Sequence, residues 1–200
     1  MICFKLKSII NLVSLKSTGN GNLTINEIKI NQDNIKVFRK RIGVIEEKIT
    51  LNPYYPKVID LMNNEIKTKN IISENYEKKL IDSLKIVGLN YQYLNRYIYT
   101  LSTLEKKLIQ VAINLLSNPN VIILEEPFKG LDIINEKRLM SLLQKIKEQY
   151  QKTIIIASNN SNILYKYTTD MIFVKNDEIL LQGPTNEVYQ RVDYLKKTQL

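Results

Sequence analysis

Val121-Ile-Ile-Leu-Glu-Glu-Pro-Phe-Lys-Gly-Leu-Asp132 runs from four apolar residues into two adjacent carboxylates, a proline and a Gly-Leu-Asp segment. An apolar run of this length predicts a strand buried on both faces of a parallel sheet. Ligands of such sheets collect just beyond the carboxyl ends of the strands, where Glu125 and Glu126 stand. Two carboxylates there are costly unless they hold a cation or take part in proton chemistry. The alternative interpretation is a strand that continues into a solvated acidic loop. The flanking sequence argues against this interpretation.

Two further segments flank this strand. Leu101-Ser-Thr-Leu-Glu105 opens a helical pattern, and its Ser102 and Glu105 have the spacing of a capping box. Downstream, Thr153-Ile-Ile-Ile-Ala157 is a second apolar run and ends in Ser158-Asn-Asn160. A helix is predicted between these two strands, over residues 135–149. This strand–helix–strand order predicts a parallel crossover.

Periodicity and turn residues predict the remaining elements. The expected strands cover residues 23–30, 42–45, 121–124, 153–157, 171–174 and 179–181, the last two forming a hairpin. The expected helices are one capped by Asp33 and running to Lys40, residues 57–66, one capped by Ser73 and ended by Gly88, one from Leu101 to about Ser117, residues 135–149, and one capped by Thr185.

Composition restricts the class of protein. The chain has 200 residues, with 44% hydrophobic and 24% charged residues, which predicts one globular domain. Its single cysteine, Cys3, excludes an intrachain disulfide, and its apolar runs are too short to span a bilayer. No signal peptide is expected, so the predicted location is cytoplasmic, including peripheral attachment to the cell membrane. The net charge of +9 comes from scattered lysines, so direct nucleic-acid binding is not expected.

The order of these segments resembles that of the ATP-binding cassette (ABC) ATPases. Leu101–Glu105 stands in the place of their signature motif, and Val121–Glu126 resembles their Walker B segment. Leu131-Asp132 resembles the D-loop, and Ser158–Asn160 stands where the family carries its switch histidine. Arg39–Glu47 resembles the strand that leads into the Q-loop.

The resemblance covers nearly the whole chain. Residues 14–30 are similar to the segment after the Walker A helix, and residues 179–197 are most similar to the ATP-binding subunits of energy-coupling factor importers of the cobalt and vitamin type. It implies an α/β fold, with a P-loop NTPase-like parallel sheet flanked by helices. Within a single nucleotide-binding domain over 1–200, it places a helical signature subdomain at about 57–117 and the sheet core at 1–56 and 118–200.

The phosphate-binding loop of the family has no counterpart in this sequence. A G-x-x-x-x-G-K-[ST] motif is absent, and Lys5 and Lys7-Ser8, which stand near its expected place, have no preceding glycine. We interpret them as surface or relic residues. The family's first strands and its adenine-stacking aromatic residue are expected to lie upstream of Met1.

The resemblance assigns roles to the acidic residues at the end of the sheet. Glu126 corresponds to the catalytic glutamate, which orients or deprotonates the attacking water. Glu125 takes the place of the aspartate that coordinates Mg²⁺, with one extra methylene. Glu47 replaces the Q-loop glutamine, and Asn159 replaces the switch histidine.

The same resemblance implies nucleotide contacts for Ser102, Glu105 and Asp132, which would face the ATP bound by a partner subunit. Thr103 and Leu104 replace two signature glycines that let the backbone approach phosphate, and Leu104 is expected to be the more damaging change. Together with the other departures, these changes predict weak or no ATP hydrolysis by the chain itself.

Several functions follow from this pattern. The first is an ATP-binding subunit of an ABC importer, with ATP and Mg²⁺ as cofactors, that forms a degenerate half of a heterodimer with a second ABC ATPase beneath a transmembrane subunit. The second is a non-enzymatic pseudo-ATPase that acts as a scaffold or regulator. The third is a soluble member of the superfamily that acts on nucleic acid or the ribosome. A decaying gene or a misplaced start remains a fourth interpretation.

Overall fold

The computed structural model describes residues 24–25, 27–31, 33–48, 54–71, 74–175 and 178–198. The predictions made for Lys5, Lys7-Ser8, residues 14–21 and Ser73 lie outside these residues.

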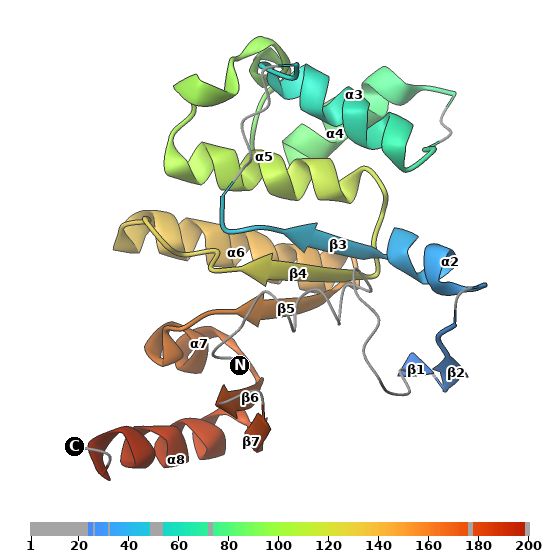
Figure 1. Ribbon diagram of the computed structural model, residues 1–200. Coiled ribbons are helices and arrows are strands. Elements are labelled where there is room, and N and C mark those ends of the chain that lie inside the picture. Colours follow the sequence, from blue (N-terminus) through green and yellow to red (C-terminus); the bar gives the residue numbers. More distant parts are fainter. Residues whose placement is uncertain are drawn as a thin grey trace.

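Three parallel strands form the central sheet, in the order β3 (Ile42–Ile45), β4 (Val121–Glu125) and β5 (Thr153–Ala157). Glu125 pairs with Ala157 as the last residue of β4 in register. All three strands point the same way, so their carboxyl ends meet at one edge (Figure 1). The predicted parallel α/β sheet with an acidic strand end is confirmed.

The sheet is covered on both faces, as the all-apolar strands predict. Ile122 and Leu124 of β4 belong to a large core that includes residues of α5 (Thr103–Leu115) and α6 (Ile133–Gln149). Ile123 points to the other face, where a smaller cluster includes Phe38 of α2 (Ile35–Lys40). Successive residues of a strand face opposite sides, so an all-apolar strand needs partners on both.

Further helices lie beyond α5, on the side away from the sheet (Figure 1). They are α3 (Val58–Thr68), α4 (Tyr76–Ile86) and the short 3₁₀ helices η1 (Tyr91–Asn95) and η2 (Ile98–Thr100). Gly88 follows α4 with a φ of +77°, so it ends the helix as predicted. Asn75 is the N-cap of α4, and its side chain accepts a hydrogen bond from the N–H of Lys78.

The C-terminal part follows the predicted order. α7 (Ser161–Tyr167) comes after β5, and the antiparallel strands β6 (Asp170–Lys175) and β7 (Glu178–Pro184) form the expected hairpin. The last helix, α8 (Thr185–Thr198), packs against this hairpin at the end of the molecule opposite α3 (Figure 1). None of the helices in the described part of the chain has the length and apolar character needed to cross a membrane.

Two predictions near the N-terminus are wrong. Residues 23–30 do not form one strand, because Glu27 adopts a φ of +65° and separates two short antiparallel strands, β1 (Thr24–Ile25) and β2 (Ile28–Lys29). The N-cap position of α2 is Asn34 rather than Asp33. The Asn34 side chain instead accepts a hydrogen bond from the N–H of Asn31. This bond closes the turn that precedes the helix.

Candidate functional site

The backbone at Glu126 places this residue between the ends of β4 and β5. Its φ is +42°, a left-handed conformation that is uncommon for residues other than glycine, asparagine and aspartate. Its N–H donates to the carbonyl of Ala157 at 2.8 Å, which extends the β4–β5 pairing by one residue. The chain turns sharply here, so Glu126 is directed at the segment that follows β5.

Both carboxylate oxygens of Glu126 accept hydrogen bonds from that segment. The hydroxyl of Ser158, a buried residue, donates to Oε2 at 2.7 Å, and the backbone N–H of Asn159 donates to Oε1 at 2.6 Å. The structure therefore brings Glu126 and Asn159 together. The contact is made by the backbone of Asn159. Ser158 is a second partner of Glu126, and the sequence alone gives it no role.

Glu47, which follows the neighbouring strand β3, lies close to Glu125, the last residue of β4. The N–H of Glu47 donates to Oε2 of Glu125 across a long 3.5 Å, and Oε1 of Glu47 lies 3.0 Å from Nζ of Lys129. The hydrogen bond from Lys129 lowers the pKa of Glu47, and the same bond raises the pKa of Lys129. This ion pair joins the segment after β3 to the segment after β4.

Lys107 is a buried cation beneath this edge that sequence reasoning missed. It is 4% exposed, and its Nζ donates to the carbonyl oxygens of Glu47 at 3.0 Å and Glu126 at 3.3 Å. Burial lowers the pKa of Lys107, while the charges of Glu47 and Glu126 oppose that shift. A signal was present in the sequence, because Lys107 falls on the helical face marked by Leu104, Leu108 and Val111.

Two more polar residues of α5 bind the carbonyl groups of β3 and of the segment that follows it. Gln110 donates to the carbonyl of Glu46, and Asn114 donates to the carbonyl of Val44, both at 3.3 Å. Gly43 makes room for this contact, since a Cβ at this position would lie 2.7 Å from Oδ1 of Asn114. The helix that begins at the signature-like segment is thus fixed against the strand that leads to Glu47.

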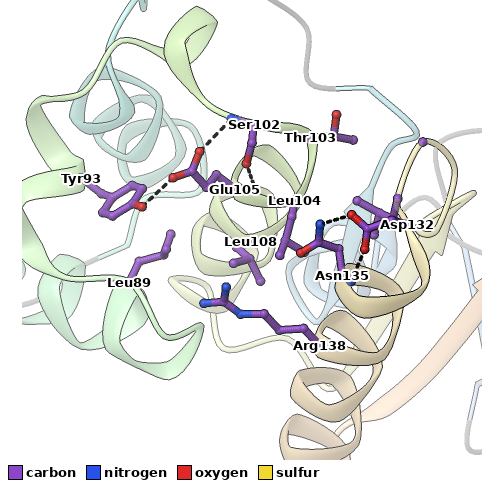
Figure 2. Close-up of a pocket in the computed structure, with 12 residues that line it drawn as sticks. Leu89, Tyr93, Ser102, Thr103, Leu104, Glu105, Leu108, Asp132, Asn135 and Arg138 are labelled. Atoms are coloured by element: carbon purple, nitrogen blue, oxygen red, sulfur yellow. Dashed lines mark hydrogen bonds between the residues drawn. The ribbon is translucent and has the colours of Figure 1, made fainter.

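A second group of predicted site residues lines a separate cavity of about 390 Å³ between the starts of α5 and α6 (Figure 2). Glu105 completes the predicted capping box with Ser102: the Ser102 N–H donates to Glu105 at 2.7 Å, and the Ser102 hydroxyl accepts from the Glu105 N–H at 3.3 Å. Tyr93 and Arg96 also donate to the Glu105 carboxylate, at 2.6 and 2.9 Å. These contacts assign Glu105 a role in organising the start of α5.

Asp132 begins α6 on the other side of the same cavity. Its carboxylate accepts from the backbone N–H of Asn135 at 2.8 Å and from the Asn135 side chain at 2.7 Å (Figure 2). The backbone hydrogen bond from Asn135 lowers the pKa of Asp132. Leu104 is 5% exposed and belongs to the core, whereas Thr103 is exposed. Both side chains line the cavity, and the effect of Leu104 on the approach of a phosphate group stays a prediction.

The carboxylates of the described residues do not form a Mg²⁺ site by themselves. Both oxygens of Glu126 already accept hydrogen bonds, and Glu47 is paired with Lys129. Nowhere in the described part of the chain do three His, Cys, Asp or Glu side chains gather in a way that could hold a metal ion. Mg²⁺ requires several oxygen ligands in near-octahedral geometry, which this donor set does not provide.

Replacing Glu105 by Gln is expected to lower the free energy of unfolding by about 1 to 2 kcal/mol near pH 6. Partial burial raises the pKa of Glu105, but the hydrogen bonds from Tyr93 and Ser102 and the charge of Arg96 outweigh it, and the pKa falls to about 2. A lowered pKa stabilises the fold above the unfolded value of about 4.3, and this contribution is lost as the pH falls towards 2. Urea unfolding at pH 6 and near pH 2 measures the difference.

The matched control for this variant is Glu77→Gln, which changes an exposed carboxylate on α4. It is expected to have a much smaller effect. If the wild-type and Glu105→Gln proteins lose stability in parallel between the two pH values, the network around Glu105 does not stabilise the fold.

Comparison with known proteins gives one consistent result. A family model described as ABC transporter matches residues 6–129, more than half of the chain. An ABC transporter ATP-binding protein of Streptococcus agalactiae is 30% identical over 181 residues, which cover 90% of this chain and 32% of that protein. The energy-coupling factor transporter ATP-binding protein EcfA2 of Clostridium perfringens is 27% identical over 197 residues, which cover 95% of this chain and 68% of that protein. The chain thus spans between about a third and two thirds of the length of such relatives.

Solved structures show the same fold. The protein cbiO1 of Clostridium perfringens, part of the ABC transporter complex cbiONQ, matches with a TM-score of 0.79 and 24% identity over 96% of this chain and 77% of that chain. A dimeric ATP-binding cassette bound to ADP and Pi matches with a TM-score of 0.74 and 20% identity over 90% and 80% of the two chains. At these identities the likeness establishes the fold alone.

Proposed function

The chain belongs to the ABC transporter family, and we propose that it is an ATP-binding subunit of an energy-coupling factor type importer, where it forms one half of a pair of ATPase subunits. The similarity to EcfA2 and to cbiO1 supports this assignment. In the proposed assembly the chain lies on the cytoplasmic face of the membrane beneath a transmembrane subunit. We place its helical subdomain at about 57–117 and its sheet core at 1–56 and 118–200.

The observation that carries the proposal is the cavity shared by Ser102 and Asp132. These residues stand at the N-caps of α5 and α6, and both are exposed on its rim. Helix N-termini present backbone N–H groups and a positive dipole end, which suit a phosphate group. Arg138 adds a positive charge to the same cavity. We infer that this surface faces the phosphates of a nucleotide bound by the partner subunit.

The edge around Glu126 supports a passive role for the chain's own nucleotide site. The Glu126 carboxylate is held by Ser158 and Asn159, which keeps it in one orientation. In the proposed pair, ATP is hydrolysed where the partner's phosphate-binding loop meets the cavity of Ser102 and Asp132, and Glu126 belongs to the chain's own, separate site. Weak or absent hydrolysis by the chain alone follows from this division of roles.

The experiment mixes the purified chain with a complete ABC ATPase subunit from the same organism. Complex formation is measured by light scattering after gel filtration, and turnover is measured by phosphate release. We expect a heterodimer whose ATPase activity exceeds that of the partner alone and falls when Ser102, which faces the partner's nucleotide, is replaced by Asp. A chain that neither binds such a partner nor changes its turnover would contradict the proposal.

The same preparation tests the scaffold alternative. This alternative is favoured because the carboxylates of Glu47 and Glu126 are already bound by other groups of the protein, through an ion pair and through hydrogen bonds. Stable association with a transporter, without measurable ATP affinity and without any effect on turnover, would support a pure scaffold. Tight ATP binding by the isolated chain would exclude it.

A further inference from the structure

We propose that two lysines, Lys107 and Lys129, neutralise the carboxylates at the end of the sheet from within the protein, so that this edge is held together without a divalent cation. The family resemblance gives neither lysine a role. Their effect on the edge depends neither on the partner nor on the transported substrate.

Lys107 is the fixed member of this pair. It extends from α5 into a buried position, and its ammonium group binds one carbonyl oxygen after β3 and another after β4. A buried cation is costly unless it has oxygen partners and opposite charges nearby. Glu47 and Glu126 supply both, through their carbonyl groups and through their charges. Lys107 therefore joins the two strand ends by hydrogen bonds.

Lys129 is the exchangeable member. It follows β4 within a short turn, and its side chain is 64% exposed, so that it reaches Glu47 from the solvent side. Its Nζ lies 3.0 Å from Oε1 of Glu47. Exposed ion pairs of this kind contribute little to stability, so Lys129 is able to leave without unfolding the edge. It nevertheless adds a positive charge where an incoming cation would have to bind.

The charges at the edge are nearly balanced. Three carboxylates, those of Glu47, Glu125 and Glu126, stand against the two ammonium groups, and Lys48 contributes further positive potential at Glu47. A divalent cation would have to displace Lys129, compete with Ser158 and Asn159 for the oxygens of Glu126, and approach Lys107. Since Mg²⁺ also gives up its water ligands reluctantly, the edge is expected to bind it weakly.

The test uses Mn²⁺ as a spectroscopic probe on the full chain, without nucleotide and without a partner. Free Mn²⁺ is measured by its electron paramagnetic resonance signal at constant ionic strength. We expect the wild-type chain to leave Mn²⁺ free up to about 1 mM, a concentration that corresponds to a binding free energy of only about −4 kcal/mol. Lys129→Ala is expected to raise Mn²⁺ affinity by about tenfold, because a neighbouring positive charge is removed.

Four further variants make the result specific. Lys129→Arg keeps the charge and is expected to behave like the wild type, as is Lys145→Ala, which removes an exposed lysine from α6. Adding Glu47→Gln to Lys129→Ala is expected to cancel the gain. Tight Mn²⁺ binding by the wild-type chain that Glu47→Gln abolishes would overturn the proposal, and so would a Lys129→Ala variant with unchanged affinity. Neither outcome would bear on the heterodimer, which is measured with a partner and ATP.

Discussion

Ser102→Asp is expected to reduce the ATPase activity of the mixed complex by about 30-fold or more while leaving the chain folded. Aspartate is as good an N-cap as serine, so the start of α5 keeps its side-chain hydrogen bond. The new negative charge would lie on the rim of the cavity assigned to a partner's phosphates, where repulsion of about 2 kcal/mol or more opposes the transition state. Phosphate release by the complex measures the effect.

Ser102→Thr is the matched control for this prediction, because it keeps both the cap and the hydroxyl group. It is expected to retain most of the activity. Equal activity of Ser102→Asp and Ser102→Thr in a stable complex would show that this cavity does not face a nucleotide.

Lys107→Met is expected to lower the free energy of unfolding by about 2 to 3 kcal/mol. Methionine fills a similar volume but donates no hydrogen bond, so the carbonyl groups of Glu47 and Glu126 both lose their charged donor. Relief from burying a charge offsets part of this loss, which keeps the expected cost below the sum of two charged hydrogen bonds. Urea denaturation monitored by circular dichroism measures the difference.

The control is Lys106→Met, one residue earlier on α5, where the side chain is only partly buried. It is expected to change stability by less than about 0.5 kcal/mol. A Lys107→Met protein as stable as the wild type would show that the buried cation does not hold the two strand ends together.

The sheet was predictable because uninterrupted apolar runs mark its strands in the sequence. Val121 to Leu124 is apolar at every position, and burial on both faces of a parallel sheet requires that pattern. The capping box of Ser102 and Glu105 was equally accessible, since it depends on two residues three positions apart. Local chemistry of this kind can be recognised without knowing the rest of the fold.

The long-range contacts were not predictable in the same way. Ser158 and Glu126 are 32 residues apart, and Lys107 and Glu47 are 60 residues apart, so no local pattern links them. The turn at Glu27 was missed because alternating polar and apolar residues suit a single strand and a tight hairpin equally well. In each case tertiary geometry decided which of several locally acceptable structures forms.

The left-handed backbone at Glu126 also has an evolutionary consequence. A glutamate in this conformation costs about 1 to 2 kcal/mol relative to glycine, and asparagine, which is abundant in this chain, tolerates it better. A lineage that retained the chain only for its fold would therefore be expected to drift towards glycine or asparagine here. In related genomes, persistence of an acidic residue at this strained position would mark descent under selection for the carboxylate itself.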